Sequence, residues 1–221
     1  MLKIKTLIFN PFRENTYLVC DSLGRCVIVD PGCDSPAEVQ QLENLVREEG
    51  LSPVRVLITH GHVDHTYGAA RCAQKYGIPV YMSSLDKETL GWMDERLSFM
   101  HIHHPEDFES TDARDGEMIG EGELECKVIA TPGHSRGGVC YLFEKDKIIF
   151  TGDTLFAGCI GRTDFFGSSL DDLLEGIRTK LMVLDGDIEV LPGHGSATDI
   201  ATERTTNPFI FEQECLTGDE K

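Results

Sequence analysis

Apolar residues recur along the chain with two different spacings, which predict strands and helices in alternation. Short runs rich in Val, Ile, Leu and aromatic residues, bounded by polar turns, are typical of buried strands, whereas apolar residues three or four positions apart are typical of one helix face. Strands are predicted at residues 15–20, 26–30, 54–59, 78–82, 126–130, 138–143, 147–150 and 188–191. Helices are predicted from Ser35 to Gly50, over residues 64–76 and 85–100, and from Ser169 to near residue 183.

Two of these helices have capping signals at their N-termini. Ser35 and Glu38 have the spacing of a capping box, and Pro36 occupies the first helical position. Ser169 precedes the last helix, with Asp172 at its third position. No proline- or glycine-rich linker interrupts the alternation of strands and helices. This organisation predicts a single α/β domain that spans the whole chain, residues 1–221.

The densest group of polar side chains directly follows the strand at residues 54–59. Three histidines and one aspartate lie there within six residues: His60, His62, Asp64 and His65. Imidazole and carboxylate are ligands that zinc, iron and manganese take in proteins. Alternate side chains of an extended segment point the same way, so His60 and His62 would face one point. Asp64 and His65 lie where the chain turns into a helix and would face a second point. The segment therefore predicts two neighbouring metal ions, and a merely solvated loop explains it less well.

Three further strand ends carry one candidate ligand each, directly after a glycine. The segments are IATPGHS with His134, IIFTGDT with Asp153 and EVLPGHG with His194. Each alone is typical of a turn, but together they fit the rule that α/β sites lie at the carboxyl ends of strands. RVLITHGH and CKVIATPGH also share the pattern T-x-G-H after an apolar strand. This repetition predicts two related β/α halves packed sheet to sheet.

The motifs HGHVDH, TPGHSRGG, TGDTLF and LPGHG, in this order, resemble the metal motifs of the metallo-β-lactamase superfamily. The resemblance covers residues 13–195. It implies an α/β fold in which two mixed β-sheets, flanked by helices, form an αββα sandwich. It also implies two divalent metal ions, with zinc favoured and iron or manganese as alternatives. His60, His62 and His134 would hold one ion, Asp64, His65 and His194 the other, and Asp153 would bridge them.

The same resemblance implies a reaction. A hydroxide between the two ions would attack a carbonyl that one ion polarises, and Asp64 and Asp153 would be the catalytic carboxylates of this site. The stretch TPGHSRGGVCYLF followed by TGDTLFAG resembles glyoxalase II, which hydrolyses the thioester of S-lactoylglutathione. The resemblance therefore implies a small-molecule thioester as substrate.

The chain departs from full-length glyoxalase II in two places. Those enzymes have a helical C-terminal region that helps to bind glutathione, whereas this sequence ends at Lys221, shortly after His194. The loop from Gly158 to Arg162 also differs from theirs. The GRTDF segment instead resembles the short bacterial glyoxalase II-type hydrolases, so the sequence leaves the thiol of the substrate open.

The GRTDF segment supplies the candidate substrate-binding residues Arg162, Thr163 and Asp164. Arg162 would bind a substrate carboxylate through a bidentate fork, or it would pair with Asp164 and order the loop; the sequence does not choose between these interpretations. Cys159 is expected to be a small buried side chain rather than a reactive thiol. A surface or pocket rim is expected for three further histidines, none of them a metal ligand: His101, His103 and His104.

Two other activities remain open. Persulfide dioxygenases resemble glyoxalase II, share a GRTDF-type loop and use a single iron, which His60, His134 and Asp153 would hold here. A lactonase would fit the hydrolase class, and a β-lactamase is disfavoured because we expect no export signal. A non-catalytic scaffold is disfavoured by the complete ligand set. Metal count and oxygen uptake would separate the hydrolase from the dioxygenase.

Charge and cysteine content restrict partners and location. The formal net charge of −18 disfavours nucleic acid and anionic membranes as partners. The eight cysteines include no CxxC pair, the N-terminal MLKIKTLIFN has no apolar run typical of a signal peptide, and no segment is apolar enough to span a membrane. We therefore expect a cytoplasmic protein with free, mostly buried thiols. The sequence indicates no particular oligomeric state.

Overall fold

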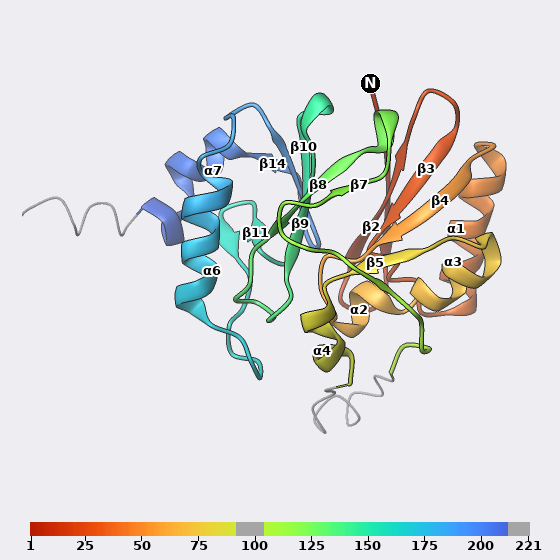
Figure 1. Ribbon diagram of the computed structural model, residues 1–221, viewed down its shortest axis with the longest axis horizontal. Helices are drawn as coiled ribbons and strands as arrows, with labels where there is room; N and C mark the ends of the chain where they lie inside the picture. The colour runs from red at the N-terminus through yellow and green to blue at the C-terminus, as the bar shows by residue number, and fades with distance from the viewer. Residues whose placement is uncertain (92–103, 212–221) are drawn as a thin grey trace, which may run out of the picture.

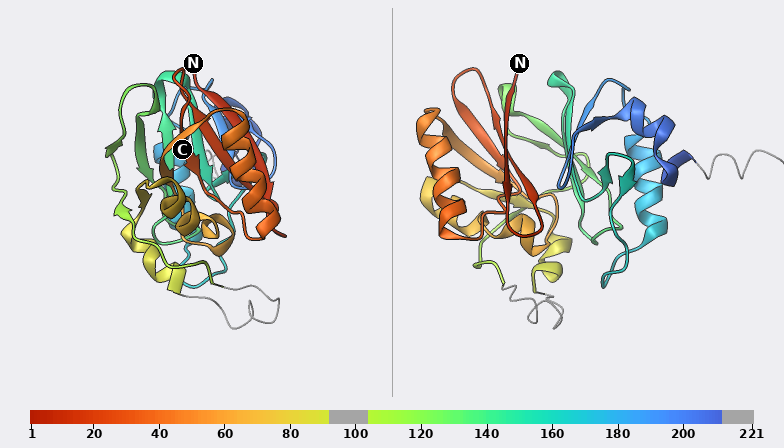
Figure 2. Two further views of the ribbon diagram at one scale, coloured as in Figure 1. Left: turned by 90° about the vertical axis from the view of Figure 1, so that its right-hand side faces the viewer. Right: turned by 180° about the vertical axis from the view of Figure 1, so that it is seen from behind.

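Two β-sheets lie face to face in the computed structural model, which describes residues 1–91 and 104–211. Helices cover the outer face of each sheet: α1 (Pro36–Glu48) and α3 (Ala69–Tyr76) on one side, α6 (Leu170–Gly176) and α7 (Ile200–Thr206) on the other (Figure 1). The view from behind in Figure 2 shows the same order of layers. The predicted αββα sandwich is confirmed.

The first sheet is formed by the N-terminal half of the chain. Its order is β1 (Lys3–Phe9), β2 (Glu14–Cys20), β3 (Arg25–Val29), β4 (Ser52–Leu57), β5 (Val80–Met82) and β6 (Thr111–Asp112). The pairs β1–β2 and β2–β3 are antiparallel, whereas β3 to β6 run parallel. Parallel neighbours need crossover connections, and α1 and α3 supply two of them.

The second sheet is formed by the C-terminal half. Its order is β14 (Thr198–Asp199), β13 (Glu189–Pro192), β10 (Ile148–Gly152), β9 (Val139–Phe143), β8 (Cys126–Ala130) and β7 (Met118–Ile119). β10 and β13 are parallel and the other neighbours are antiparallel. A small ribbon of β11 (Leu155–Phe156) and β12 (Cys159–Ile160) follows β10. A 3₁₀ turn, η2 (Gly122–Leu124), precedes β8, and η3 (Glu144–Asp146) joins β9 to β10.

Three apolar layers hold the sandwich together. Tyr17 and Val19 of β2 face the second sheet, whereas Leu18 and Cys20 face the helical layer of α1 and α3. A third layer packs the second sheet against α6 and α7. Because the central strands are buried on both faces, they form nearly continuous apolar runs, and this made them recognisable in the sequence.

The capping predictions are confirmed. The Ser35 hydroxyl accepts a hydrogen bond from the Glu38 N–H at 3.3 Å, and the Glu38 carboxylate accepts one from the Ser35 N–H at 3.0 Å. The Ser169 hydroxyl accepts one from the Asp172 N–H at 3.2 Å. These bonds satisfy N–H groups that a helix N-terminus leaves without an intrahelical partner.

The prediction of a single helix over residues 64–76 is wrong. The structure has α2 (Val63–Thr66) and α3, with a break at Gly68. The Gly68 N–H donates to the Pro31 carbonyl at 2.7 Å, and a Cβ at this position would lie 2.4 Å from the Cys33 sulfur. The chain therefore bends to pack closely against the loop that follows β3.

Two other predicted helices differ from the observed ones. The helix from Ser169 changes at Ile177 into a π-helical turn, η4 (Ile177–Leu181). The helix predicted at 85–100 begins as a 3₁₀ turn, η1 (Ser84–Asp86), followed by α4 (Lys87–Gly91), and residues 92–100 lie outside the described residues. No helix in the described part of the chain is long and apolar enough to cross a membrane.

Candidate metal centre

Seven predicted ligand side chains converge where the loops after β4, β8, β10 and β13 meet. They come from both halves of the sandwich and fall into overlapping groups whose ligand atoms lie within 4.8 Å of one another. The structure thus brings together all members of the predicted set: His60, His62, Asp64, His65, His134, Asp153 and His194.

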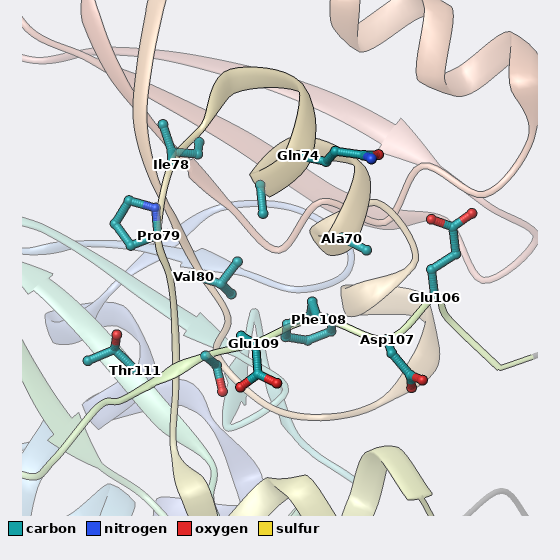
Figure 3. A pocket seen from close by; sticks show the side chains of 12 residues that line it. Ala70, Gln74, Ile78, Pro79, Val80, Glu106, Asp107, Phe108, Glu109 and Thr111 are labelled. Atoms are coloured by element: carbon teal, nitrogen blue, oxygen red, sulfur yellow. The ribbon is translucent and has the colours of Figure 1, made fainter.

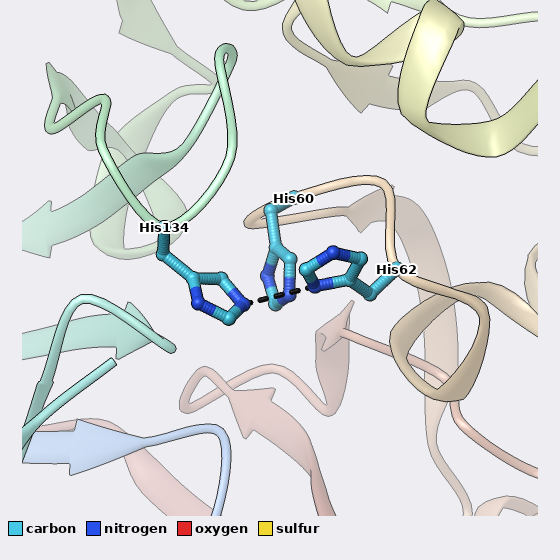
Figure 4. A group of neighbouring side chains, drawn as sticks. All are labelled: His60, His62 and His134. Atoms are coloured by element: carbon cyan, nitrogen blue, oxygen red, sulfur yellow. Dashed lines mark hydrogen bonds between the residues drawn. The ribbon is translucent and has the colours of Figure 1, made fainter. Parts of the chain in front are cut away.

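The first pocket consists of His60, His62 and His134 (Figure 4). His60 and His62 follow β4 of the first sheet, whereas His134 follows β8 of the second. The His134 Nε2 lies 2.9 Å from the His62 Nδ1. The His60 Nε2 is buried and has no hydrogen-bond partner. These atoms therefore form one nitrogen-rich position between the two halves.

The second pocket consists of Asp64, His65 and His194. The Asp64 Oδ2 lies 3.3 Å from the His194 Nε2 and 3.8 Å from the His65 Nε2. His65 is fully buried and its Nε2 has no hydrogen-bond partner, whereas the His194 side chain is 26% exposed. This pocket combines a carboxylate with two imidazoles and opens toward solvent at His194.

Asp153 lies between the two pockets. Its Oδ2 is 3.5 Å from the His134 Nε2, whereas its Oδ1 is 3.4 Å from the His65 Nε2 and 3.7 Å from the His194 Nε2. The Oδ1 atom is buried without a hydrogen-bond partner. Each carboxylate oxygen thus faces a different pocket, as a bridging ligand requires.

Backbone and side-chain acceptors orient three of the imidazoles. The His134 Nδ1 donates to the Arg162 carbonyl at 2.7 Å, and the His194 Nδ1 donates to the Phe12 carbonyl at 3.1 Å. The His65 Nδ1 donates to the Asp30 carboxylate at 2.9 Å. In the neutral imidazole, a proton held at Nδ1 leaves Nε2 with a free lone pair. Each of these three rings therefore presents Nε2 to its pocket.

Asp30 was missed by the sequence reasoning although a signal was present. It directly follows the buried strand β3, much as Asp153 follows β10. Its carboxylate accepts hydrogen bonds from the Thr59 N–H at 2.7 Å and the Thr59 hydroxyl at 2.6 Å, and that hydroxyl oxygen lies 3.0 Å from the His60 Nδ1. Asp30 therefore orients His65 directly and His60 through Thr59, one ligand in each pocket.

The two pockets differ in charge. Burial lowers the pKa of His60, and burial together with the nearby His134 lowers the pKa of His62 to about 3. Burial opposes the charged form of His65 as well, but the carboxylates of Asp64 and Asp153 outweigh it and raise the pKa. Burial also disfavours charge on His194, but the hydrogen bond to Asp64 and the negative charges of Asp153 and Asp64 together outweigh it, so that this pKa is raised too.

The candidate substrate residues lie in an exposed loop beside the first pocket. The Arg162 guanidinium donates two hydrogen bonds to Asp164, at 2.9 and 2.8 Å, and both side chains are more than half exposed, at 69% and 65%. The structure thus contains the internal ion pair that was one of the two interpretations. Thr163, between them, is half-buried.

Phe165, which the sequence reasoning did not single out, contacts the first pocket. Its ring centroid lies 4.9 Å from that of His62 and 5.7 Å from that of His134. The Arg162 guanidinium lies over the Phe165 ring, 4.7 Å from its centroid. The loop therefore presents an apolar ring to the site.

Cys159 is exposed, so the expectation that it is buried is wrong. It lies on β12 of the small ribbon at the surface, next to Gly158, whereas the other cysteines in the described residues are buried. His104 is exposed, as expected, and His101 and His103 lie outside the described residues.

A separate surface hollow of about 630 Å³ lies between α3, β5 and residues 106–111 (Figure 3). Acidic side chains of Glu106, Asp107 and Glu109 surround an apolar floor that includes Phe108. None of the seven candidate ligands lines it. We place the chemistry at the ligand cluster, because buried ligand atoms without hydrogen-bond partners lie there, at His60, His65 and Asp153.

Comparison with known proteins identifies the family. Residues 9–194 match the family model described as the metallo-beta-lactamase superfamily. The chain belongs to this superfamily. The probable metallo-hydrolase YqgX of Bacillus subtilis is 34% identical over 215 residues, covering 95% of this chain and 98% of YqgX. The hydroxyacylglutathione hydrolase GloC of Haemophilus influenzae is 32% identical over 212 residues, covering 95% of this chain and 98% of GloC.

Solved structures agree with this assignment. The crystal structure of the BLEG-1 B3 metallo-beta-lactamase matches with a TM-score of 0.86 and 30% identity, over 95% of this chain and 100% of that chain. The structure of TTHA1623 in a di-iron-bound form matches with a TM-score of 0.80 and 32% identity, over 94% of this chain and 99% of that chain. The family and the His/Asp cluster together identify a metal-dependent enzyme.

Proposed function

We propose that the protein is a dinuclear metal-dependent hydrolase of small hydroxyacyl thioesters. The position of Asp153 supports the proposal of two metal ions, because its two oxygens face two separate groups of ligand atoms. The substrate class is supported by the similarity to GloC, which extends over nearly the full length of both chains.

The donor atoms fit two metal ions. The Nε2 atoms of His60 and His65 and the Oδ1 of Asp153 are buried without hydrogen-bond partners. Leaving a buried polar atom unpaired costs about 1–3 kcal/mol, and a bound cation would remove that cost at all three atoms. The all-nitrogen and oxygen set suits zinc, iron or manganese. We propose zinc, while the di-iron form of TTHA1623 makes iron the alternative.

Bound ions would supply a water made nucleophilic near neutral pH and would polarise the scissile carbonyl. The protein's residues hold and shape this site. In the metal-free site, burial raises the pKa of Asp64 and Asp153, but the charge of His65 together with the hydrogen bonds from His194 to Asp64 and from His65 to Asp153 outweighs it and holds the pKa of both carboxyls low. Both carboxylates are therefore anionic and available to a cation. Phe165 forms an apolar wall beside His62, where the acyl group of a substrate would lie.

Binding of the thiol half should be weak. The full chain has a net charge of −18, and glutathione is also an anion, so long-range electrostatics disfavour their encounter. Arg162, the cation nearest the pocket in the GRTDF loop, is already paired with Asp164. We therefore propose that Thr163 and Asp164 line the pocket while Arg162 contributes little attraction.

Metal analysis and a substrate panel test this proposal. Metal-loaded protein should contain two ions per chain and hydrolyse S-lactoylglutathione with a high KM that falls as salt screens the repulsion. A neutral lactoyl thioester should show little salt dependence. A homoserine lactone, a β-lactam and glutathione persulfide complete the panel, with oxygen uptake followed for the persulfide.

His62→Ala should abolish thioester cleavage, whereas His104→Ala, a histidine outside the cluster, should not change it. One ion at saturation, no thioester cleavage and oxygen uptake on the persulfide would replace the hydrolase with a mono-iron dioxygenase that uses His60, His134 and Asp153. Faster cleavage of the lactone or the β-lactam would reassign the substrate.

A further inference from the structure

Asp86 is a fully buried carboxylate that belongs to neither pocket. It ends the 3₁₀ turn η1, which follows β5 in the first sheet. β5 pairs with β4, so this turn lies beside the segment that carries His60 and His62. A fully buried aspartate needs several donors, and the donors of Asp86 come from both halves of the molecule.

The Asp86 carboxylate joins the two loops that supply the first pocket. Its Oδ2 accepts from the Gly61 N–H at 2.8 Å and from the Ser135 hydroxyl at 2.7 Å. Its Oδ1 accepts from the Gly137 N–H at 2.6 Å. Gly61 lies between His60 and His62, and Ser135 directly follows His134. One side chain therefore holds the backbone beside all three ligands of the first pocket.

Two glycines make this approach possible. A Cβ at Gly61 would lie 2.6 Å from the Asp86 carbonyl oxygen, and a Cβ at Gly137 would lie 2.7 Å from the Asp86 nitrogen. Neither distance is tolerable for a real side chain, and both neighbouring atoms are backbone. The two ligand loops are thus built to pack directly against the Asp86 turn.

We infer that Asp86 is a positioning residue that fixes the three ligands of the first pocket relative to one another before an ion binds. The inference rests on the proposed metal function, but it concerns one pocket only. In the described structure the Asp86 carboxylate accepts no hydrogen bond from the second-pocket ligands or from the residues directly beside them in the chain, so other groups position Asp64, His65 and His194.

Titration of the metal-free full chain with zinc tests the inference. Outer partners of metal ligands typically change metal affinity by about 10–100-fold, so Asp86→Asn should weaken the first-pocket ion by that factor and leave the second-pocket ion unchanged. Titrations of His62→Ala and Asp64→Ala assign the two dissociation constants to their pockets. In metal-free protein, the amides of Gly61 and Gly137 should also exchange faster with deuterium in Asp86→Asn than in wild type.

Asp21→Asn is the control for loss of a buried aspartate. The Asp21 side chain is 1% exposed and accepts hydrogen bonds from Leu23 and Arg25 in the β2–β3 turn. It should lower the melting temperature without changing either metal affinity. Equal effects of the two Asp→Asn variants on stability, with both metal affinities unchanged, would reduce Asp86 to a structural residue and overturn the inference.

Ser135→Ala and Thr89→Ala decide the question if Asp86→Asn does not fold. Both remove one hydroxyl donor to Asp86, but Thr89, 3.2 Å away, lies in α4, which follows η1, and its hydroxyl bonds to Asp86 rather than to a ligand loop, whereas the Ser135 hydroxyl comes from the loop of His134. Ser135→Ala alone should weaken the first-pocket ion. No difference between these variants would overturn the inference, whereas a wild-type chain that binds no metal would instead reject the proposed function.

Discussion

The two pockets use similar side chains in opposite electrostatic settings. The first contains three imidazoles and shares only Asp153 as an anion, and burial lowers the pKa of His60 and His62. The second has its own carboxylate, and the pKa of both of its histidines is raised. His60 and His62 are therefore ready to bind a cation, whereas His65 and His194 must first release protons.

The pockets also differ in the hydrogen bonds that join the N-terminal and C-terminal halves of the chain beside them. A carboxyl side chain, that of Asp86, joins the loops at the first pocket. At the second, Asn15 at the start of β2 donates from its N–H to Gly193 at 2.7 Å, and its side-chain amide donates to Pro192 and Gly195 at 3.0 Å each. Neutral amide contacts thus join the two halves at the second pocket, whose candidate ligands include a carboxylate of their own. A carboxyl group joins them at the first pocket, whose own ligands are all imidazoles.

The largest effect is expected from Asp153→Asn, which removes the charge shared by the two pockets. The variant preserves the shape of the side chain but loses its charge and one oxygen. Both ions should therefore bind at least about 100-fold more weakly, which exceeds the usual effect of removing a residue that only hydrogen-bonds to a metal ligand. Turnover should fall below detection. The measurement is zinc titration of the variant beside Asp64→Asn, which should weaken the second-pocket ion more than the first. Because the remaining oxygen of the asparagine could still bind one ion, Asp153→Ala is titrated as well. An Asp153→Ala variant that loses only one ion would show that Asp153 does not bridge.

Acidification should weaken metal binding to a different extent in the two pockets, with a smaller effect than Asp153→Asn. Protons compete with the metal for histidine nitrogens, and a histidine whose pKa is raised above 6.5 starts to compete at a higher pH than one whose pKa is lowered. From pH 7.5 to 5.5, the second-pocket ion should therefore lose affinity, by about tenfold per pH unit for each displaced proton. Because the pKa of His60 is lowered and that of His62 lies at about 3, protons should compete less for these two nitrogens, and the first-pocket ion should lose less affinity than the second. Zinc titrations at both pH values check this, and parallel losses in the two pockets would contradict it.

The family resemblance implied the αββα layers, whereas the central strands and the candidate ligands could be predicted from the residues for a shared physical reason. Strands such as β3 and β10 are buried on both faces, so they are continuous apolar runs, and the ligands follow them directly at their carboxyl ends. β1 was missed because it is an edge strand with Lys3 and Lys5 on its exposed face, and only its pairing with β2 makes it a strand.

The groups that orient the ligands were less predictable. Asp86 follows a three-residue strand and has no motif around it, and its role arises only when the loop of His134 arrives from the other half. The carbonyls of Phe12 and Arg162 act through the backbone, which carries no sequence signal at all. Periodicity and motif spacing find ligands, whereas contacts between distant segments decide how these ligands are held.

The smallest effect is expected at the ion pair beside the first pocket. Arg162 orients His134 through its backbone carbonyl, which Arg162→Ala retains. Because exposed ion pairs contribute about 0–1 kcal/mol, Arg162→Ala, Asp164→Ala and the double variant should all keep both ions and change KM less than about fivefold.

The three variants together distinguish an ordering pair from a substrate-binding arginine. If the pair only orders the loop, each single variant removes the whole interaction, and the double variant should resemble either one. If Arg162 binds a substrate carboxylate, Arg162→Ala should raise KM, whereas Asp164→Ala should lower it by releasing the guanidinium. Opposite signs for the two single variants would therefore contradict the ordering role. Because neither change touches Asp64, His65 or His194, the affinity of the second-pocket ion should stay constant in all three variants and confirm that the effect is confined to the first pocket.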